Sequence, residues 1–173
     1  MLAALTVRME EVGLRLHPDK TKIVYCKDWR RRADYGHTSF TFLEYTFAPR
    51  PARAKDGTMF LGFFPAVCRE AVNAMGRQVR KWRLRLWTGR RLDEIAAQVN
   101  PIVAGWINYY GRFYRSKMSP LLQRINTYLM RWARWKYKRL RSDKRFKAWW
   151  LGVIDGDPEL FAHWRWVRTF AGL

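Results

Sequence analysis

Apolar positions in the first part of the chain recur with the period of a helix and then with that of a strand. Residues 1–13 carry apolar side chains three and four positions apart, which predicts an amphipathic helix that ends at Gly13. After a turn at Pro18, the pattern of residues 22–26, Lys-Ile-Val-Tyr-Cys, predicts a short strand. The chain is therefore expected to begin with one helix and one strand.

The strongest strand pattern lies in the aromatic stretch at residues 39–47, Ser-Phe-Thr-Phe-Leu-Glu-Tyr-Thr-Phe. Phe40 and Phe42, and after a shift Tyr45 and Phe47, alternate with a period of two, as expected of a half-buried strand. A second strand is predicted at residues 58–64, directly after the turn pair Asp56-Gly57. We expect the two strands to pair antiparallel across a basic loop at residues 50–55.

From Pro65 onward the apolar period is that of a helix. Proline suits the first position of a helix, because its missing N–H would have no partner there. A short helix follows at residues 92–99, after Gly89 has ended the first one. The first helix has one predicted apolar face, at Val67, Ala71, Met75, Val79, Trp82 and Leu86.

Two residue pairs that end in proline mark further helix starts. Asn100-Pro101 predicts that the short helix stops and that a new one begins, with Asn as the N-cap and Pro in the first position. Ser119-Pro120 repeats this pattern. The helix that follows has its predicted buried face at Leu122, Ile125, Leu129 and Trp132.

The charge pattern is most pronounced on the other side of that helix. Residues 111–147 contain thirteen Lys or Arg residues and one acid, Asp143. Solvated helix faces usually intersperse both signs of charge, so a surface of one sign favours contact with a polyanion. Five of the cations recur at spacings of three and four and form one stripe if the helix persists: Arg131, Arg134, Lys138, Arg141 and Arg145.

Composition also favours a polyanionic partner. The 173-residue chain has 34 Lys and Arg against 14 Asp and Glu, a net charge of +20, and about half of its residues are apolar. Such an excess repels itself in a compact fold unless nucleic acid or an anionic membrane surface neutralises it. The first residues lack a cationic start and a small-residue cleavage site, so we expect no secretory signal, and no apolar run reaches the roughly 18 residues that a transmembrane helix needs. We therefore expect a cytoplasmic protein without a membrane partner.

Motifs for catalysis or metal binding are absent from the sequence. Cys26 and Cys68 share no short spacing, and the three histidines have no motif partner. Asp155 and Asp157 lie two residues apart, but a turn and the N-cap of a last helix at residues 159–170 explain them better than a metal does. We expect no metal and no catalytic site in the chain itself.

The aromatic segment at residues 100–114 is the expected hub of the helical part. One face of its helix is predicted to lie in the core, at Ile102, Val103, Trp106, Ile107 and Tyr110. The other faces hold the candidates for contact with nucleic acid, Asn108, Tyr109 and Arg112. This segment is therefore expected to fix where the surrounding cations point.

Several motifs along the chain resemble the group II intron reverse transcriptases. Residues 14–23, Leu-Arg-Leu-His-Pro-Asp-Lys-Thr-Lys-Ile, resemble their sixth conserved block. Residues 40–47 resemble the seventh, with Glu44 where the family prefers Gly. Residues 67–145 resemble the maturase-specific domain, or thumb, whose signature Asn-Pro-x-x-x-Gly-Trp-x-Asn-Tyr-Tyr matches residues 100–110.

The resemblance implies an α+β fold that is mainly α. Residues 1–64 would form the end of a reverse-transcriptase palm with a short β-hairpin, residues 65–147 a thumb-like helical bundle, and residues 148–173 a tail helix. The metal-binding aspartates of the polymerase, including a Tyr-Ala-Asp-Asp motif, would lie upstream. The chain thus resembles a C-terminal fragment that lacks polymerase activity by itself, and Mg²⁺ would act only through an RNA or a polymerase partner chain.

The function that the resemblance implies is that of a maturase-type protein, which binds structured group II intron RNA and assists its splicing. The five stripe cations are the expected phosphate contacts. Three further arginines are expected as secondary contacts, Arg77, Arg80 and Arg112. Two lysines of the palm-derived part would touch the nucleic-acid backbone, Lys20 and Lys22. By the resemblance, the seventh block would form a primer-gripping hairpin, with three of its residues near a primer end, Phe42, Leu43 and Tyr45.

Two other interpretations stay open. In the first, the chain is the thumb subunit of a split RNA-directed DNA polymerase that holds a primer–template or a DNA target, and an upstream chain supplies the fingers and palm. In the second, it is a truncated remnant without a selected function. A neighbouring upstream reading frame that ends in the Tyr-Ala-Asp-Asp block would favour the first, and the absence of a cooperative melt would favour the second.

Overall fold

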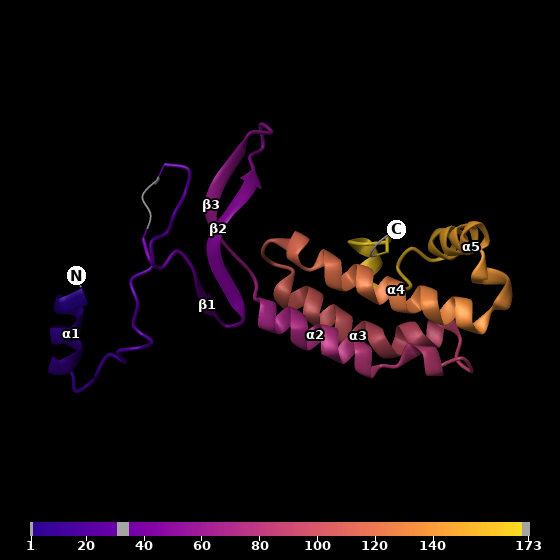
Figure 1. Cartoon of the computed structure of the whole chain (residues 1–173), viewed down its shortest axis with the longest axis horizontal. Coiled ribbons are helices and arrows are strands. Elements are labelled where there is room, and N and C mark those ends of the chain that lie inside the picture. Colours follow the sequence, from indigo (N-terminus) through magenta and orange to yellow (C-terminus); the bar gives the residue numbers. More distant parts are fainter. Residues whose placement is uncertain (1, 31–34, 171–173) are drawn as a thin grey trace. The chain divides into compact units, whose positions relative to one another are not determined.

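The computed structural model describes residues 2–30 and 35–170, which fall into two compact units (Figure 1). The first unit spans residues 1–65 and contains helix α1 (Leu2–Glu11) and most of a three-stranded sheet. The second unit spans residues 66–173 and is helical. The predicted α+β class with mainly helical content is confirmed.

The strand expected at residues 22–26 is wrong. This segment forms no ladder of hydrogen bonds with another strand. Isolated backbone hydrogen bonds hold it and the residues that follow. The Tyr25 N–H donates to the His37 carbonyl at 2.8 Å, and the Trp29 N–H donates to the Leu61 carbonyl at 3.0 Å. Side chains typical of a strand indicate an extended backbone, but a strand also needs a neighbouring strand with which to pair.

The aromatic stretch forms a hairpin rather than the single strand expected at residues 39–47. The chain folds back at Leu43 and Glu44, whose backbones are both left-handed, with φ of 46° and 64°. Positive φ at both positions is what a two-residue type I′ turn requires. The rings of Phe40 and Phe47 stack across the antiparallel pair at 4.7 Å. The sheet holds three strands in chain order, β1 (Phe40–Phe42), β2 (Tyr45–Arg53) and β3 (Met59–Val67).

The second hairpin turns at Asp56-Gly57, as predicted. Gly57 has a φ of 90°, and the Asp56 carboxylate accepts hydrogen bonds from the Thr58 N–H (2.9 Å) and hydroxyl (2.7 Å). These bonds stabilise the charged form and hold the pKa of the Asp56 carboxyl below its usual value. The basic loop expected at residues 50–55 is too long, because β2 continues through Arg53.

Helix α4 is the centre of the second unit. It packs against α2 and against η1, a short 3₁₀ helix. Its predicted buried face is confirmed, since Leu122, Ile125, Leu129 and Trp132 have no exposed surface. The unit contains helices α2 (Arg69–Lys81), α3 (Leu92–Tyr110), α4 (Ser119–Lys136) and α5 (Asp143–Gly156). Its short 3₁₀ helices are η1 (Leu84–Leu86), η2 (Arg115–Lys117), η3 (Lys138–Arg141) and η4 (Ala162–Arg165).

Helix α2 starts later and ends earlier than predicted. Pro65 lies in β3, and the N-cap is Cys68, whose sulfur accepts a backbone N–H of the first turn at 3.3 Å. The helix cannot continue to Gly89, because Arg83 has a left-handed backbone with φ of 48°. The resulting turn buries Leu84, and the predicted core residue Leu86 is exposed.

The helix break expected at Asn100-Pro101 is wrong, since α3 is continuous and contains Pro101. Proline removes one N–H donor from the helix interior. Asn100 does not cap a helix: its side-chain amide donates to the Leu160 carbonyl at 2.8 Å and accepts from the Ala162 N–H at 3.0 Å. The asparagine therefore ties α3 to the C-terminal segment.

The C-terminal part also differs from the prediction. Helix α4 ends before Tyr137, which has an extended backbone with φ of −112° and ψ of 99°, so the basic stripe does not lie on one continuous helix. The last helix expected at residues 159–170 is wrong, because that segment contains the short turn η4 and is otherwise irregular. The Asp157 carboxylate accepts the Glu159 N–H at 3.1 Å and so stabilises a turn.

Candidate nucleic-acid interface

Cations crowd two segments of the helical unit. Residues 77–91, which cover the end of α2 and all of η1, contain seven Lys or Arg residues and no acid. Residues 124–141, along α4 and η3, contain another seven and again no acid. Because η1 packs against α4, the two segments meet in the fold. Their combined positive potential suits a polyanion.

The structure distributes the five predicted stripe cations over three elements. Arg131 is exposed on α4, with its guanidinium 5.8 Å from the ring centre of Tyr128. Lys138 and Arg141 are exposed in η3, and Arg145 is exposed in α5. These four side chains are accessible to a ligand, and their role as phosphate contacts stays a prediction.

Arg134 differs from the other members of the stripe. Its guanidinium donates to the Asp143 carboxylate and lies 4.9 Å from the ring centre of Phe146, and only 26% of its side chain is exposed. Both partners belong to α5. Arg134 therefore joins α4 to α5 and is less available to a phosphate than Arg131 is.

The secondary candidates lie at the surface. The exposed ones are Arg77 and Arg80 on α2, Asn108 and Tyr109 on α3, and Arg112 just after α3. The ring of Tyr109 meets that of its neighbour Tyr110 edge-on, with centroids 4.8 Å apart. The structure thus presents two arginines on one helix and a mixed polar and aromatic group on another.

The aromatic segment at residues 100–114 contributes to the core as expected. Val103 and Tyr110 are buried, and the ring of Trp106 stacks on that of Trp82 with centroids 6.0 Å apart. Ile102 departs from the prediction and lies at the surface. The segment thus packs α3 against Trp82, the residue that follows α2, and forms part of the core beneath the basic surface.

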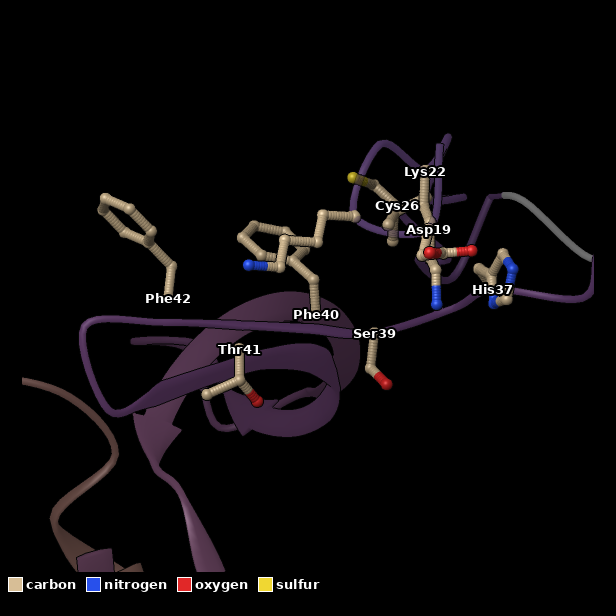
Figure 2. A pocket seen from close by; sticks show the side chains of 10 residues that line it. Asp19, Lys22, Cys26, His37, Ser39, Phe40, Thr41 and Phe42 are labelled. Atoms are coloured by element: carbon tan, nitrogen blue, oxygen red, sulfur yellow. The ribbon is translucent and has the colours of Figure 1, made fainter. Parts of the chain in front are cut away.

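In the first unit, three predicted site residues line one hollow. Lys20 and Lys22 come from the irregular segment before the sheet, and Phe42 comes from the end of β1. Figure 2 shows Phe42 and His37 at opposite ends of this hollow. The remaining lining residues are mostly small or polar: Asp19, Val24, Cys26, Ser39, Phe40 and Thr41.

The residues that resemble a primer grip lie on both sides of the β1–β2 turn. Phe42 and Leu43 are exposed, and Tyr45 is buried. The left-handed backbone at Glu44 explains the family preference for glycine at this position, because glycine has no Cβ to crowd such a conformation. Only Phe42 of these residues belongs to the hollow.

A buried polar network, which the sequence interpretation did not identify, anchors the C-terminal segment. Asn126 on α4 is fully buried, and its amide donates to the carbonyls of Val167 (3.3 Å) and Thr169 (2.8 Å). Its Oδ1 atom accepts from the indole N–H of Trp164 at 3.1 Å and lies 2.7 Å from Nε2 of His163. An asparagine between Ile125 and Leu129 on an apolar helix face was the available signal.

Burial sets the charge state of His163. Its side chain has no exposed surface, and desolvation lowers the pKa of its imidazole to about 3. Its Nδ1 atom is buried without a hydrogen-bond partner in the structure. The ring is therefore neutral at physiological pH and is a structural group rather than a general base.

The part of the chain that the structure describes offers no metal cluster and no membrane-spanning helix. Within residues 2–30 and 35–170, no three His, Cys, Asp or Glu side chains gather where they could hold a metal ion. Over the same residues, no helix has both the length and the apolar composition to cross a membrane. The features that stand out are thus the basic surface and the aromatic residues on it.

The second unit is a cationic helical domain built around α4. Residues 72–150, from α2 into α5, match the family model of the group II intron, maturase-specific domain. The chain therefore carries a group II intron maturase-specific domain, and the resemblance inferred from its sequence is confirmed over these residues. Searches of curated proteins and of solved structures found no match.

Proposed function

We propose that the chain binds structured group II intron RNA and assists its splicing, and that it has no polymerase activity by itself. The observation that carries this proposal is the match of residues 72–150 to the maturase-specific domain. The matched helices also hold the acid-free basic segments. Folded RNA presents phosphates and 2′-hydroxyls on its surface, so a cationic helical domain recognises its shape rather than its base edges.

RNA binding is tested by comparing a folded group II intron transcript with an unrelated structured RNA of equal length. Phosphate contacts release counterions, so both affinities are expected to fall at least about tenfold between roughly 50 and 200 mM salt. The intron RNA is expected to bind more tightly throughout. An intron affinity that barely changes with salt, or equal affinities for the two RNAs, overturns this part of the proposal.

Splicing assistance has its own test, the rate at which the intron transcript splices at low Mg²⁺ with and without the protein. We expect faster splicing with the protein, because bound Lys and Arg side chains replace part of the neutralising charge that Mg²⁺ supplies. An unchanged rate at saturating protein overturns this part. Extension of a primer by the chain alone would overturn the third part, which denies it polymerase activity.

A second candidate function is that of a thumb subunit in a split RNA-directed DNA polymerase. It is favoured by the hollow of the first unit, where Lys20 and Lys22 lie with Phe42, near the turn that the resemblance assigns to a primer end. In this role a partner chain with the Tyr-Ala-Asp-Asp block supplies the aspartates that bind Mg²⁺. Primer extension by the mixture, and by neither chain alone, would favour this candidate.

A further inference from the structure

One tryptophan of the helical unit lies at the surface, in the middle of the cations. Trp135, in the last turn of α4, has 59% of its surface exposed, whereas Trp132 one turn earlier is fully buried. The guanidinium of Arg85 lies 5.2 Å from the ring centre of Trp135. An indole this exposed adds little to the core, so its position on the surface calls for another explanation.

Two hydrogen bonds join the end of α4 to the segment that follows Arg85. The indole N–H of the buried Trp132 donates to the Trp87 carbonyl at 2.9 Å, and the Lys136 ammonium donates to the Arg90 carbonyl. Arg85 belongs to η1, which packs against α4. The packing and the two hydrogen bonds therefore position Arg85 beside Trp135.

The charge around this pair favours nucleic acid over protein as the ligand. Arg85 belongs to the first acid-free basic segment and Trp135 to the second, and together these contain fourteen cations. Exposed aromatic and arginine side chains also occur at protein interfaces, together with apolar neighbours such as Leu86. A protein partner would need a strongly acidic surface here, whereas every nucleic acid already carries the complementary charge.

We propose that Trp135 and Arg85 form a stacking platform for an unpaired base of the bound RNA, in a loop, bulge or single-stranded end. This inference rests on the proposed RNA-binding function and adds a type of contact to it. A base in a duplex is already stacked on its neighbours, so only an unpaired base can lie on the indole. The guanidinium of Arg85 lies over the ring of Trp135, so the base stacks on the exposed part of the indole and the guanidinium stays within reach of the flanking phosphate.

The test compares two short ligands with the same charge. One is a single-stranded RNA of mixed sequence about ten nucleotides long, a length typical of such sites. The other is an abasic sugar–phosphate chain of equal length. We expect Trp135→Ala to weaken binding of the RNA at least about fivefold and to leave binding of the abasic chain unchanged, because base–aromatic stacking is the interaction removed.

Three further variants separate stacking from charge and from folding. Trp135→Leu keeps an apolar side chain but has no ring, so it is expected to behave like Trp135→Ala. Arg85→Lys keeps the charge, so it preserves the salt dependence while weakening the preference for RNA over the abasic chain. Leu151→Ala removes an equally exposed apolar side chain from α5 and is the matched control, with both affinities unchanged.

Specific outcomes overturn the proposal. If Trp135→Ala lowers the affinity for both ligands equally, or changes neither affinity, Trp135 does not stack on a base. An unchanged affinity for both ligands would instead favour a protein as the partner of this surface. Because indole carries no charge, the slope of log affinity against log salt must also stay as in the wild type. Failure of the wild type to bind any RNA overturns the proposed function itself, which this comparison distinguishes from the loss of stacking alone.

Discussion

His163 lies with its Nε2 atom 2.7 Å from Oδ1 of Asn126, and this contact fixes the tautomer of the buried ring. The carbonyl oxygen of Asn126 can only accept, since its amide nitrogen already donates to two backbone carbonyls. Nε2 therefore carries the proton and Nδ1 is bare. Asn126 also accepts a hydrogen bond from the indole N–H of Trp164. One side chain on α4 therefore binds the C-terminal segment to the core.

The first prediction concerns Asn126. Replacing it with Ala leaves the ring N–H of His163 and the indole N–H of Trp164 buried without an acceptor, together with two backbone carbonyls. Each such group costs about 1–3 kcal/mol if nothing replaces its partner, so we expect Asn126→Ala to lower the free energy of unfolding by about 2–4 kcal/mol, after partial relaxation. Denaturant unfolding followed by tryptophan fluorescence measures the change.

The matched control for Asn126 is its neighbour on α4, Gln123. It also reaches the C-terminal segment, with its amide 3.4 Å from the Thr169 hydroxyl, but this contact is exposed. Gln123→Ala is expected to change stability by less than about 0.5 kcal/mol. Equal effects of the two variants would mean that burial of the network contributes nothing.

The second prediction concerns pH. The pKa of His163 is lowered to about 3 in the folded chain, against 6.5 in the unfolded chain. The unfolded state therefore binds one more proton between these values. The contribution of the neutral ring to stability is fully present above pH 6.5 and is lost as the pH falls, by about 1.4 kcal/mol for each pH unit below 6.5.

The measurement compares unfolding free energies at pH 6.5 and at about pH 5, above the range where ordinary carboxylates titrate. His163→Gln keeps a donor for Asn126 but cannot titrate, so its stability is expected to fall much less over this interval. His17→Gln, an exposed change in the first unit, serves as the control with wild-type dependence. Parallel curves for His163→Gln and the wild type would contradict the assignment.

The third prediction concerns Gly111, which caps α3 where Trp166 packs on it. A Cβ at this position would lie 2.0 Å from the Cη2 atom of Trp166 and 2.3 Å from the Ile107 carbonyl oxygen. We expect Gly111→Ala to cost about 1–3 kcal/mol of stability, because the tryptophan must move. Gly105→Ala, at an open position within α3, is expected to stabilise the chain by about 0.5–1 kcal/mol. A neutral Gly111→Ala would show that the C-terminal segment adjusts freely.

The fourth prediction concerns the β1–β2 turn. Glu44 holds a φ of 64°, which costs a residue with a Cβ about 1 kcal/mol relative to glycine. Glu44→Gly is therefore expected to slow amide hydrogen exchange in the β1–β2 pair by roughly threefold to fivefold, while Glu44→Ala keeps the strained backbone and shows no slowing. Equal exchange in all three proteins would mean that the turn stores no strain.

The sequence predicted the elements that depend on residues close together along the chain. The α4 face that ends at Trp132 and the turn at Asp56-Gly57 follow from periodicity and turn chemistry alone, and both are confirmed. The resemblance implied a hairpin in the seventh block, but the residue pattern did not show the β1–β2 turn, because Leu43 and Glu44 are not residues that favour positive φ. Its left-handed backbone must be imposed by the pairing of the strands on either side.

Other differences arose because long-range contacts override local signals. Asn100-Pro101 has the residues of a helix start, yet Asn100 uses its side chain on a segment sixty residues away in the sequence. The basic stripe followed from a spacing that assumes one helix, and Tyr137 interrupts it. Spacing placed Trp132 on the buried face, but the Trp135 surface was not predicted, because its partner Arg85 comes from another element, η1.

The last prediction separates two arginines three residues apart on α4. Arg131 is exposed, so Arg131→Ala is expected to change stability by less than about 0.5 kcal/mol. If it contacts a phosphate, the slope of log affinity for intron RNA against log salt falls by about one-half to one unit. Arg134 is held by Asp143 and packs on Phe146, so Arg134→Ala is expected to lower stability by about 1–2 kcal/mol as well.

Measuring unfolding and RNA affinity on the same two variants distinguishes the roles of these arginines. Arg134→Ala can also weaken RNA binding indirectly, by displacing α5. The single variant Asp143→Ala tests this, because it breaks the same ion pair and keeps the arginine. If Asp143→Ala alone destabilises the chain and leaves RNA affinity unchanged or improved, the Arg134–Asp143 pair is structural, because removing the acid frees a cation for RNA. If Arg131→Ala keeps the wild-type salt dependence, Arg131 does not contact RNA, and the proposed RNA interface would then lie on η3 and α5.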